Sequence, residues 1–476
     1  MSTKMGFWRW ALASAAVLIV TGTAGASVVE PTGVTTDGPA ALVLYPKLKV
    51  DLNTCEGGKC SLTPDTECSS SSDCPSGATE DTIVQLTNTS EFLTKVHCFY
   101  TNANSHCSNS PTTVCTDANF RDVCPLGGLC IAGWQETDFR LTLTKRQPIS
   151  WSINDGLPSL PLATMPGQGS PPQFNEGNIP AVPEVPFTGE LLCIEVDPST
   201  ELPSDRNDFK GEASEITTIR EHIDANKYNA IGIKAIEGAQ DGNPNVLNIG
   251  GPNAEYGTFD QVNGAFVGCP NILTVDHFFD GAQVVTHDFT VFGPVNSALT
   301  IVPCQRDYLT QTANGVNATI QFLVFNEFEQ RFSTSTKLNC YKEIRLSDID
   351  TLPGTPGDTF SIFSVGVEGT LTGMSRLRSV PGPNVDGYDG RTILAVLTEN
   401  WASGICDGAG ATTGSGYYEQ TDLCTTPDDC SGSTVCHPAG SAVPCDGGPA
   451  CVSTDTANVQ FNGSRDQGDQ ITIPLP

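Results

Sequence analysis

The stretch from Val316 to Leu352 constrains the fold more than any other, because its 37 residues include no Gly and no Pro. The whole chain of 476 residues carries 47 Gly and 33 Pro. Within the stretch, polar side chains alternate with apolar ones at Ala318, Ile320, Phe322, Val324, Phe328, Phe332, Leu338, Cys340 and Ile344. Such alternation is typical of strands with one buried face. One strand of this length would exceed those of globular proteins, so we predict a hairpin that turns near 326–331 or 333–336.

Similar alternating runs recur along the chain, and no run of 12 residues shows the 3.6-residue period of an amphipathic helix. Strands separated by turn residues, without alternating helices, predict an all-β fold built as tandem β-sandwich domains with disulfide-rich loop insertions. The predicted parts are a first sandwich over 27–197, a second over 198–401, a Cys-rich segment over 402–456 and a C-terminal tail over 457–476. Within the first sandwich we expect Cys-rich insertions at 52–80 and 106–135 and a Pro-rich loop at 157–186.

The first 26 residues have the pattern of a secretory signal peptide. Lys4 and Arg9 precede an apolar run from Trp10 to Val20, and small residues end at Ala26. The run is too short to span a bilayer, so cleavage after Ala26 is expected. No later segment predicts a membrane span. We therefore expect a secreted protein, extracellular or at the cell surface, with the periplasm as an alternative.

The net charge limits the partners. The chain has 24 Lys and Arg against 54 Asp and Glu, a formal charge of −30. Removal of 1–26 takes away two basic and no acidic residues, which gives −32. Such a surface repels nucleic acid and attracts cations. Calcium is the one cofactor considered, with carboxylate ligands at Asp117 and Asp122 or at Asp428 and Asp429, although these lack the regular spacing of a calcium loop.

All 19 cysteines follow the signal segment, and disulfides are expected in an oxidising compartment. No Cys-x₂-Cys pair indicates a zinc site, and the odd total leaves one thiol unpaired or joined to another chain. A repeat relates Cys115–Cys130, Cys424–Cys436 and, in part, Cys68–Cys74. We predict that Cys98 and Cys107 close a local loop and that Cys340 ties two core strands. The disulfide candidates are Cys98, Cys107, Cys115, Cys124, Cys130, Cys193, Cys269, Cys304, Cys340, Cys424, Cys430, Cys436, Cys445 and Cys451.

The strand sequence of residues 40–197 resembles a known fold family. An apolar opening strand is followed by QLTNTS, KVHCFY, DFRLTLTKRQPISWSI and FTGELLCIEV. This order is similar to that of immunoglobulin-like sandwiches of the pilus-chaperone or sperm-protein type. The resemblance implies a fold and carries no site with it. The later stretches LVFNEFEQRFSTST and KGEAS resemble those of uncharacterised secreted bacterial proteins, which implies no function.

Two groups of residues are candidate catalytic centres. Glu327 and Glu329 would face the same side of a strand, and Asn326-Glu327 resembles the acid/base pair of barrel glycosidases. The chain shows no β/α alternation for such a barrel, so a solvent-exposed strand face is the preferred interpretation. His277 and Asp280 lie near His287-Asp288 in the sequence, but no Gly-x-Ser-x-Gly motif accompanies them. We expect no catalytic, cofactor-binding or metal-ligating residues.

These observations favour a structural, adhesion or binding protein whose partner is an extracellular protein or glycan. One alternative is a carbohydrate-binding or carbohydrate-active protein, which would need an aromatic platform on a sheet face. A second is a protease inhibitor that acts through its Cys-rich modules, which would need an exposed, rigid loop between paired cysteines.

Overall fold

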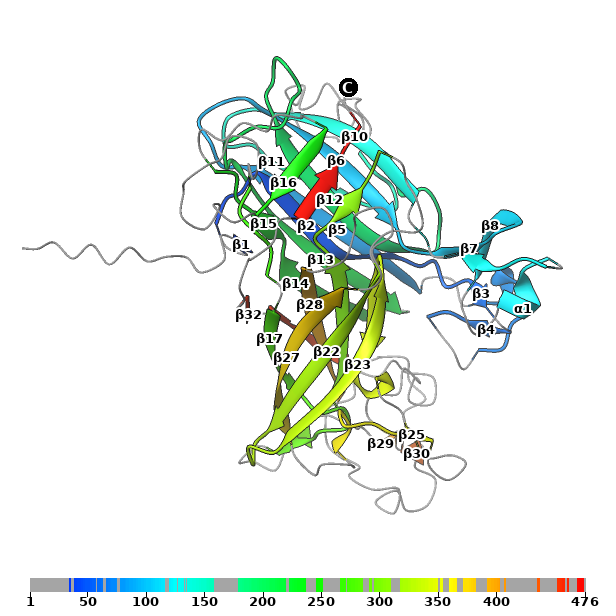
Figure 1. The fold of residues 1–476 in the computed structure, drawn as a ribbon. Coiled ribbons are helices and arrows are strands. Elements are labelled where there is room, and N and C mark those ends of the chain that lie inside the picture. Colours follow the sequence, from blue (N-terminus) through cyan, green and yellow to red (C-terminus); the bar gives the residue numbers. More distant parts are fainter. Residues whose placement is uncertain are drawn as a thin grey trace, which may run out of the picture. The chain divides into compact units, whose positions relative to one another are not determined.

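The described part of the chain is almost entirely β-structure in the computed structural model (Figure 1). The structure describes residues 34–474 with gaps, the longer ones being 158–178, 237–244, 251–265, 286–290, 310–316, 354–358, 366–370, 382–391, 408–434, 437–451 and 462–468. The predicted signal peptide therefore lies outside the described residues. The short helical turns are α1 (Phe120–Val123), η1 (Ser71–Asp73) and η3 (Leu346–Asp348). Within the described part, no helix has the length and apolar character needed to cross a membrane.

The first sandwich consists of two antiparallel sheets. The six-stranded sheet has the order β1 (Val34–Thr35), β15 (Ile231–Ile233), β2 (Leu42–Val50), β12 (Phe187–Val196), β6 (Thr94–Asn102) and β10 (Gln135–Leu143). The four-stranded sheet has the order β11 (Pro148–Ser152), β5 (Thr79–Asn88), β13 (Phe209–Ile219) and β14 (His222–Asn229). All ladders within both sheets are antiparallel.

The core of this sandwich lies between the two sheets. Val84 and Leu86 of β5 alternate with less buried residues and point into this core, as the period-2 pattern predicts. They meet Tyr100 of β6 and Phe139 of β10 from the opposite sheet. The Trp151 indole donates a hydrogen bond to the Tyr100 hydroxyl over 2.6 Å, so this aromatic pair also satisfies its polar atoms.

The six-stranded sheet is buried on its other face as well. There a three-stranded sheet covers it, with the order β16 (Val246–Ile249), β33 (Asp469–Thr472) and β21 (Arg306–Asp307). Phe99 of β6 stacks on Tyr308 with ring centroids 4.6 Å apart. Burial on both faces explains why β2 and β12 are nearly continuous apolar runs, because neither face of these strands meets water.

A second sandwich contains the predicted hairpin. Its five-stranded sheet has the order β23 (Arg331–Asn339), β22 (Asn317–Asn326), β27 (Thr372–Pro381), β17 (Ile272–Phe278) and β32 (Gln460–Phe461). The facing sheet has the order β24 (Lys342–Arg345), β20 (Val295–Pro303), β28 (Ile393–Ala402) and β31 (Val452–Asn458). Ile320 and Phe322 from the first sheet pack with Leu299 and Leu397 from the second.

The hairpin prediction is confirmed at the first of its two predicted turns. β22 and β23 pair in antiparallel register from Asn317 opposite Asn339 to Phe325 opposite Arg331. The Asn326 carboxamide oxygen accepts the amide hydrogens of Phe328 and Gln330 and so organises the turn. Phe328 was expected among the buried positions, but it is 68% exposed because it lies in this turn, beyond the paired strands.

The first sandwich includes strands that lie beyond the predicted boundary at residue 197. β13 pairs with β5 and β15 pairs with β2, so the first sandwich extends to residue 233. At the other end of the chain, β31 extends the sheet of β28, and β33 pairs with β16. The chain beyond residue 452, expected in part as a tail, thus contributes strands to both regions. Alternation shows that a segment is a strand, but it does not show which sheet that strand joins.

A network of buried and half-buried charges joins the first sandwich to the second. The Lys47 ammonium lies 2.8 Å from a Glu215 carboxylate oxygen and donates to the Thr398 hydroxyl over 3.2 Å. The neighbouring Lys49 lies 2.7 Å from Glu343 of β24. Burial opposes the charge on Lys49, but the nearby carboxylates, led by Glu343, raise its pKa above the ordinary value. The charges of this network are therefore paired rather than isolated.

Two disulfide-bonded modules project from the first sandwich. The first Cys module comprises residues 55–74 with β3 (Cys55–Glu56) and β4 (Lys59–Cys60). The second comprises residues 105–131 with β7 (Ser105–Cys107), β8 (Ser110–Cys115) and β9 (Cys130–Ile131). Smaller ribbons elsewhere are β18 (Val284–Val285) with β19 (Val291–Phe292), β25 (Leu352–Pro353) with β26 (Thr359–Phe360), and β29 (Cys406–Asp407) with β30 (Val435–Cys436).

Candidate functional site

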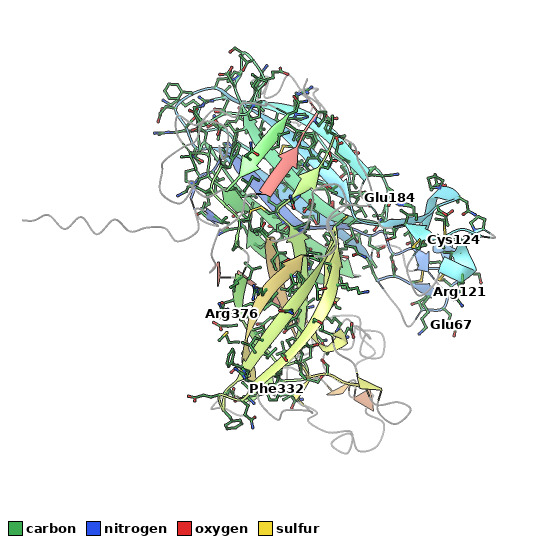
Figure 2. All side chains as sticks on the ribbon, viewed as in Figure 1. Glu67, Arg121, Cys124, Glu184, Phe332 and Arg376 are labelled. Atoms are coloured by element: carbon green, nitrogen blue, oxygen red, sulfur yellow. A yellow bond between two sulfur atoms is a disulfide. The ribbon has the colours of Figure 1, made fainter. Side chains whose placement is uncertain are left out.

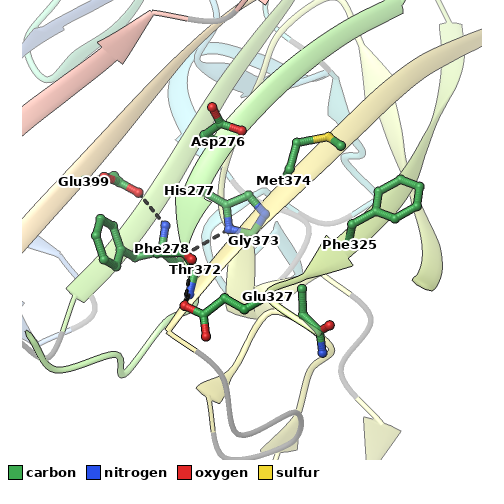
Figure 3. Close-up of a pocket in the computed structure, with 10 residues that line it drawn as sticks. Asp276, His277, Phe278, Phe325, Glu327, Thr372, Gly373, Met374 and Glu399 are labelled. Atoms are coloured by element: carbon green, nitrogen blue, oxygen red, sulfur yellow. Dashed lines mark hydrogen bonds between the residues drawn. The ribbon is translucent and has the colours of Figure 1, made fainter. Parts of the chain in front are cut away.

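A pocket of about 580 Å³ gathers residues from separate parts of the second sandwich (Figure 3). It lies where β17, β22 and β27 meet the end of β28. Two candidates that the sequence placed 50 positions apart, His277 and Glu327, line it together. The full lining is Asp276, His277, Phe278, Phe325, Asn326, Glu327, Thr372, Gly373, Met374 and Glu399.

His277 is held as a neutral, buried imidazole. Its side chain is 3% exposed, and its ring packs against Phe279 and Phe363. Its Nε2 lies 2.7 Å from the Ser375 hydroxyl oxygen and its Nδ1 lies 3.1 Å from the Phe278 carbonyl oxygen. Burial lowers the pKa of His277 to about 4. The imidazole therefore stays uncharged at neutral pH and acts as a hydrogen-bonding group within the sheet.

Glu327 and Glu329 differ from the predicted arrangement, since neither lies within a strand. β22 ends at Asn326, and both glutamates are exposed in the following turn. Glu329 has a positive φ of 60°, which belongs to the turn conformation. The Glu327 carboxylate accepts hydrogen bonds from the Thr372 hydroxyl over 2.8 Å and from the Thr372 amide over 3.1 Å. These bonds, the hydroxyl first, lower the pKa of Glu327. No hydrogen bond joins Glu327 to His277, both of which the structure describes.

Glu399, which lines the pocket, and Asp280, which lies outside its lining, bind backbone groups. Glu399 is 8% exposed and accepts the Phe278 amide hydrogen over 2.7 Å. Asp280 accepts the amide hydrogens of Ser297 over 2.7 Å and Ser347 over 3.0 Å. Burial raises the pKa of Asp280. Both side chains thereby satisfy buried donors at the end of the sandwich. His287 and Asp288, the other half of this predicted cluster, lie outside the described residues.

A second concave surface lies on the side of the five-stranded sheet that faces away from the core. We call it the outer face; it consists of Ile272, Thr274, Thr319, Gln321, Leu323, Arg331, Ser333, Ser335, Lys337, Arg376 and Arg378. A groove of about 650 Å³ runs over it, lined by Ile272, Gln321, Phe322, Leu323, Ser333, Thr334, Ser335, Arg376 and Arg378. Sequence alternation identified the polar positions of β22 and β23, but it gave no sign that β27 adds two arginines beside them.

The disulfides correct one predicted pairing. Cys98 bonds to Cys193, which lies directly opposite it in the neighbouring strand, rather than to Cys107. Cys107 belongs to the second Cys module and bonds to Cys124. Cys340, which was expected to tie two core strands, is buried in the apolar cluster that also contains Phe99 and Tyr308. Cys269 bonds to Cys304.

The two Cys modules share one connectivity, in which the first cysteine bonds to the third and the second to the fourth. The bonds are Cys55–Cys68, Cys60–Cys74, Cys107–Cys124 and Cys115–Cys130. Three cysteines in each module lie within 4.8 Å of one another, but all are oxidised and so provide no thiolates for a metal. The side chains of the remaining candidates, Cys424, Cys430, Cys436, Cys445 and Cys451, lie outside the described residues, as do the calcium candidates Asp117, Asp122, Asp428 and Asp429.

The second Cys module is anchored to the sandwich by Glu184. One carboxylate oxygen accepts the side-chain amides of Asn102 and Asn104, each over 2.7 Å, and the other lies 2.9 Å from the His106 Nε2. Burial raises the pKa of Glu184, but these three hydrogen bonds outweigh it and the pKa is lowered. A charged Glu184 therefore orients the base of the module.

Comparison with known proteins adds nothing to this geometry. No family model matches the sequence, and no curated protein matches it.

Proposed function

We propose that the chain is a secreted or cell-surface protein that acts by binding, in an adhesive or structural role. The disulfides fit an oxidising environment, and the amino-terminal pattern fits export. Within this proposal, the first sandwich is an immunoglobulin-like domain of the type that its strand order resembles. The observation that supports a binding role most directly is the outer face of the second sandwich. There, polar and basic side chains of three adjacent strands are exposed around a groove.

The arrangement of the pocket in Figure 3 favours binding over catalysis. His277 is buried and bonded to Ser375, and Glu327 is bonded to Thr372. A general acid or base needs a hydrogen-bonding position toward substrate and a pKa near the working pH. The pKa of His277 is about 4 and that of Glu327 is lowered, so both shifts move away from neutrality.

The test uses the mature chain, residues 27–476, purified under oxidising conditions and labelled with a fluorophore. We expect it to bind a subset of immobilised extracellular glycans and matrix preparations, with saturation and with competition by unlabelled chain. If the chain bound none of the glycans or matrix preparations saturably, the proposal would be overturned. Glu327→Gln should bind as the parent does; if it instead abolishes hydrolysis of a glycan that the parent cleaves, the carbohydrate-active alternative is correct.

A second candidate function, protease inhibition, is favoured by the surface of the second Cys module. Leu129 is 61% exposed and lies immediately before the disulfide-bonded Cys130. Val114 and Ile131 pair with His106 from either side in the small sheet and are 37% and 41% exposed. A rigid loop that presents an apolar side chain is the feature this function requires.

Inhibition can be measured directly against a panel of secreted serine, cysteine and metalloproteases. An inhibitor acting through this loop would lose potency at least tenfold with Leu129→Asp, whereas Leu52→Asp, an exposed apolar residue outside the module, would have no effect. Unchanged activity of every protease in the presence of the parent chain would eliminate this candidate.

A further inference from the structure

We propose that the outer face binds an anionic polysaccharide, one that carries carboxylate or sulfate groups along its length. This inference deepens the proposed binding function and rests on it. Three features of the face support this inference, namely its charge, the positions of its residues in the sheet and the hydrogen-bonding groups that it exposes.

Four cationic side chains stand on this face although the protein is strongly acidic. Arg331 and Lys337 lie on β23, and Arg376 and Arg378 lie on β27, all exposed. Among the residues that the structure describes, none of the four makes an ion pair or a side-chain hydrogen bond. Lysine and arginine number 24 in a chain with 54 acidic residues, so most cations would be expected beside a carboxylate. These four remain available to an external anion.

The strand register places the two arginines side by side. Arg376 lies opposite Leu323 and Arg378 lies opposite Gln321 on β22. Residues two apart on a strand project from the same face, and their Cα atoms lie about 7 Å apart along the strand. Arg376 and Arg378 therefore point to the same side of β27. Figure 2 shows Arg376 on this sheet, away from Phe332, which lies just after the hairpin turn. A linear polymer with regularly spaced acidic groups would meet both arginines at once.

Hydroxyl and amide groups continue the same rows across the sheet. On the far side of β22, Ser335 lies opposite Gln321 and Ser333 lies opposite Leu323. Ser335 and Arg378 are therefore two strands apart, about 10 Å at the usual strand spacing. The groove between them offers donors and acceptors for sugar hydroxyls, and guanidinium groups that bind carboxylate or sulfate through paired hydrogen bonds.

The composition of the face favours a polysaccharide over a protein partner. Protein interfaces concentrate their affinity in aromatic and other large apolar side chains at the centre of the contact. Here the central apolar residues, Ile272 and Leu323, are half-buried between polar neighbours. A hydrated, charged chain needs no apolar anchor, because charge-assisted hydrogen bonds supply both affinity and orientation.

Acidic residues define one end of this surface. Asp276 is exposed and lies opposite Met374, one row beyond Arg376 toward the hairpin turn. Glu327 and Glu329 follow in the turn itself. The negative charge at that end repels an anionic polymer, so the expected path runs along Arg376 and Arg378 toward Lys337.

The experiment compares the mature chain with a variant that carries both Arg376→Gln and Arg378→Gln. The control carries Lys145→Gln and Arg146→Gln, which removes the same charge from the turn between β10 and β11, where both cations pair with Glu91. The probes are heparin, polygalacturonate, neutral dextran and poly-L-glutamate, measured by biolayer interferometry at several salt concentrations. Thermal unfolding of all three proteins establishes that each is folded.

We expect the parent and the control to bind heparin or polygalacturonate and to ignore dextran. The double variant should lose about tenfold to a hundredfold in affinity, as expected when a charge-assisted contact is removed. Lysine at both positions should restore part of the affinity, because it keeps the charge and loses the paired hydrogen bonds.

Three results would overturn the inference. One is that the parent and the double variant bind every anionic polysaccharide with equal affinity, or that neither binds any of them. Another is tighter binding to poly-L-glutamate than to both polysaccharides, which would indicate an acidic protein partner. The third is self-association of the parent that the double variant abolishes, which would make a second copy of the chain the occupant. If the parent failed to bind heparin and polygalacturonate but still bound another glycan saturably, the general binding function would stand and only this inference would fail.

Discussion

Glu190 of β12 and Arg306 of β21 form a fully buried, two-pronged ion pair. The guanidinium Nε and one terminal nitrogen each donate to a separate Glu190 carboxylate oxygen over 2.6 Å. Another guanidinium nitrogen donates to the Cys304 carbonyl oxygen over 3.0 Å. Arg306 and Glu190 are each 1% exposed, so water screens neither charge. This pair joins the six-stranded sheet of the first sandwich to the small sheet that contains the end of the chain.

Removing one partner of this pair should destabilise the fold strongly. Arg306→Met leaves the Glu190 charge buried without compensation, and we expect a loss of about 3 to 5 kcal/mol in the free energy of unfolding. The double substitution Glu190→Leu with Arg306→Met should cost less than Arg306→Met alone, because it leaves no isolated charge. Urea denaturation followed by tryptophan fluorescence measures both; a loss below about 1 kcal/mol for Arg306→Met would contradict the assignment.

Glu195 should make the protein less stable as the pH rises. Its side chain is buried, and burial first, then repulsion by Asp208, raises its pKa to about 8 despite the neighbouring Arg206. The folded state therefore holds a proton that the unfolded chain releases near its ordinary pKa of 4.5. This contribution is fully present below pH 4.5 and is lost as the pH rises through 8, at roughly 1.4 kcal/mol per pH unit at most.

Glu195→Gln should remove this dependence, since glutamine stays neutral. Denaturation midpoints measured at pH 5 and pH 8 should differ less in the variant than in the parent. Equal pH dependence in the two proteins would show that Glu195 is ionised in the folded state.

His277 should act in the opposite direction, on the acid side. Its folded pKa of about 4 lies below the ordinary 6.5, so the stability it contributes is present above pH 6.5 and is lost as the pH falls toward 4. His277→Gln should flatten this acid limb while costing some stability at neutral pH through the lost ring contacts. Proton NMR titration of the imidazole gives the pKa directly, and a value above 6 would refute the buried neutral form.

The Cys98–Cys193 and Cys115–Cys130 disulfides should have different effects when removed. Cys98–Cys193 joins neighbouring core strands across 95 positions, so replacing both by Ala should cost about 2 to 5 kcal/mol of global stability. Cys115–Cys130 belongs to a separate small cluster in the second Cys module. Its replacement should loosen the module and leave the main thermal transition in place. Proteolysis mapping distinguishes the two; a shared loss of the main transition would contradict this separation.

Asn88 should be structural rather than a glycosylation site. It begins the triplet Asn88-Thr-Ser90, yet its buried side-chain nitrogen donates to the carbonyl oxygens of Phe92, Leu143 and Thr144. Asn88→Ala should cost about 1 to 3 kcal/mol, because these carbonyl oxygens lose their donor. Thr89→Ala is the control, since its hydroxyl is exposed and donates to the Asp208 carbonyl oxygen. Mass spectrometry of chain expressed in a glycosylating host should find Asn88 unmodified.

Local patterns in the sequence were sufficient for the β-class, the hairpin and the inward side of its strands. Alternation at Ile320, Phe322 and Val324 depends only on neighbouring positions, and all three are buried as it requires. The long apolar run of β12 also indicated a strand, although its burial on two faces became clear only from the sheets that cover it. The pattern failed at Phe328, because a turn within an alternating stretch interrupts the period without changing the residue types.

Only the tertiary structure decided which distant segments meet. It placed Cys193 opposite Cys98, Thr372 against Glu327, and Arg376 and Arg378 beside the serines of β23. Each of these contacts depends on the register and order of strands that are far apart in the chain. A strand's own residues determine which face is apolar, whereas its neighbours are selected by the packing of whole sheets. The sequence by itself therefore determined the strands, and the tertiary structure decided how they combine into surfaces that can bind.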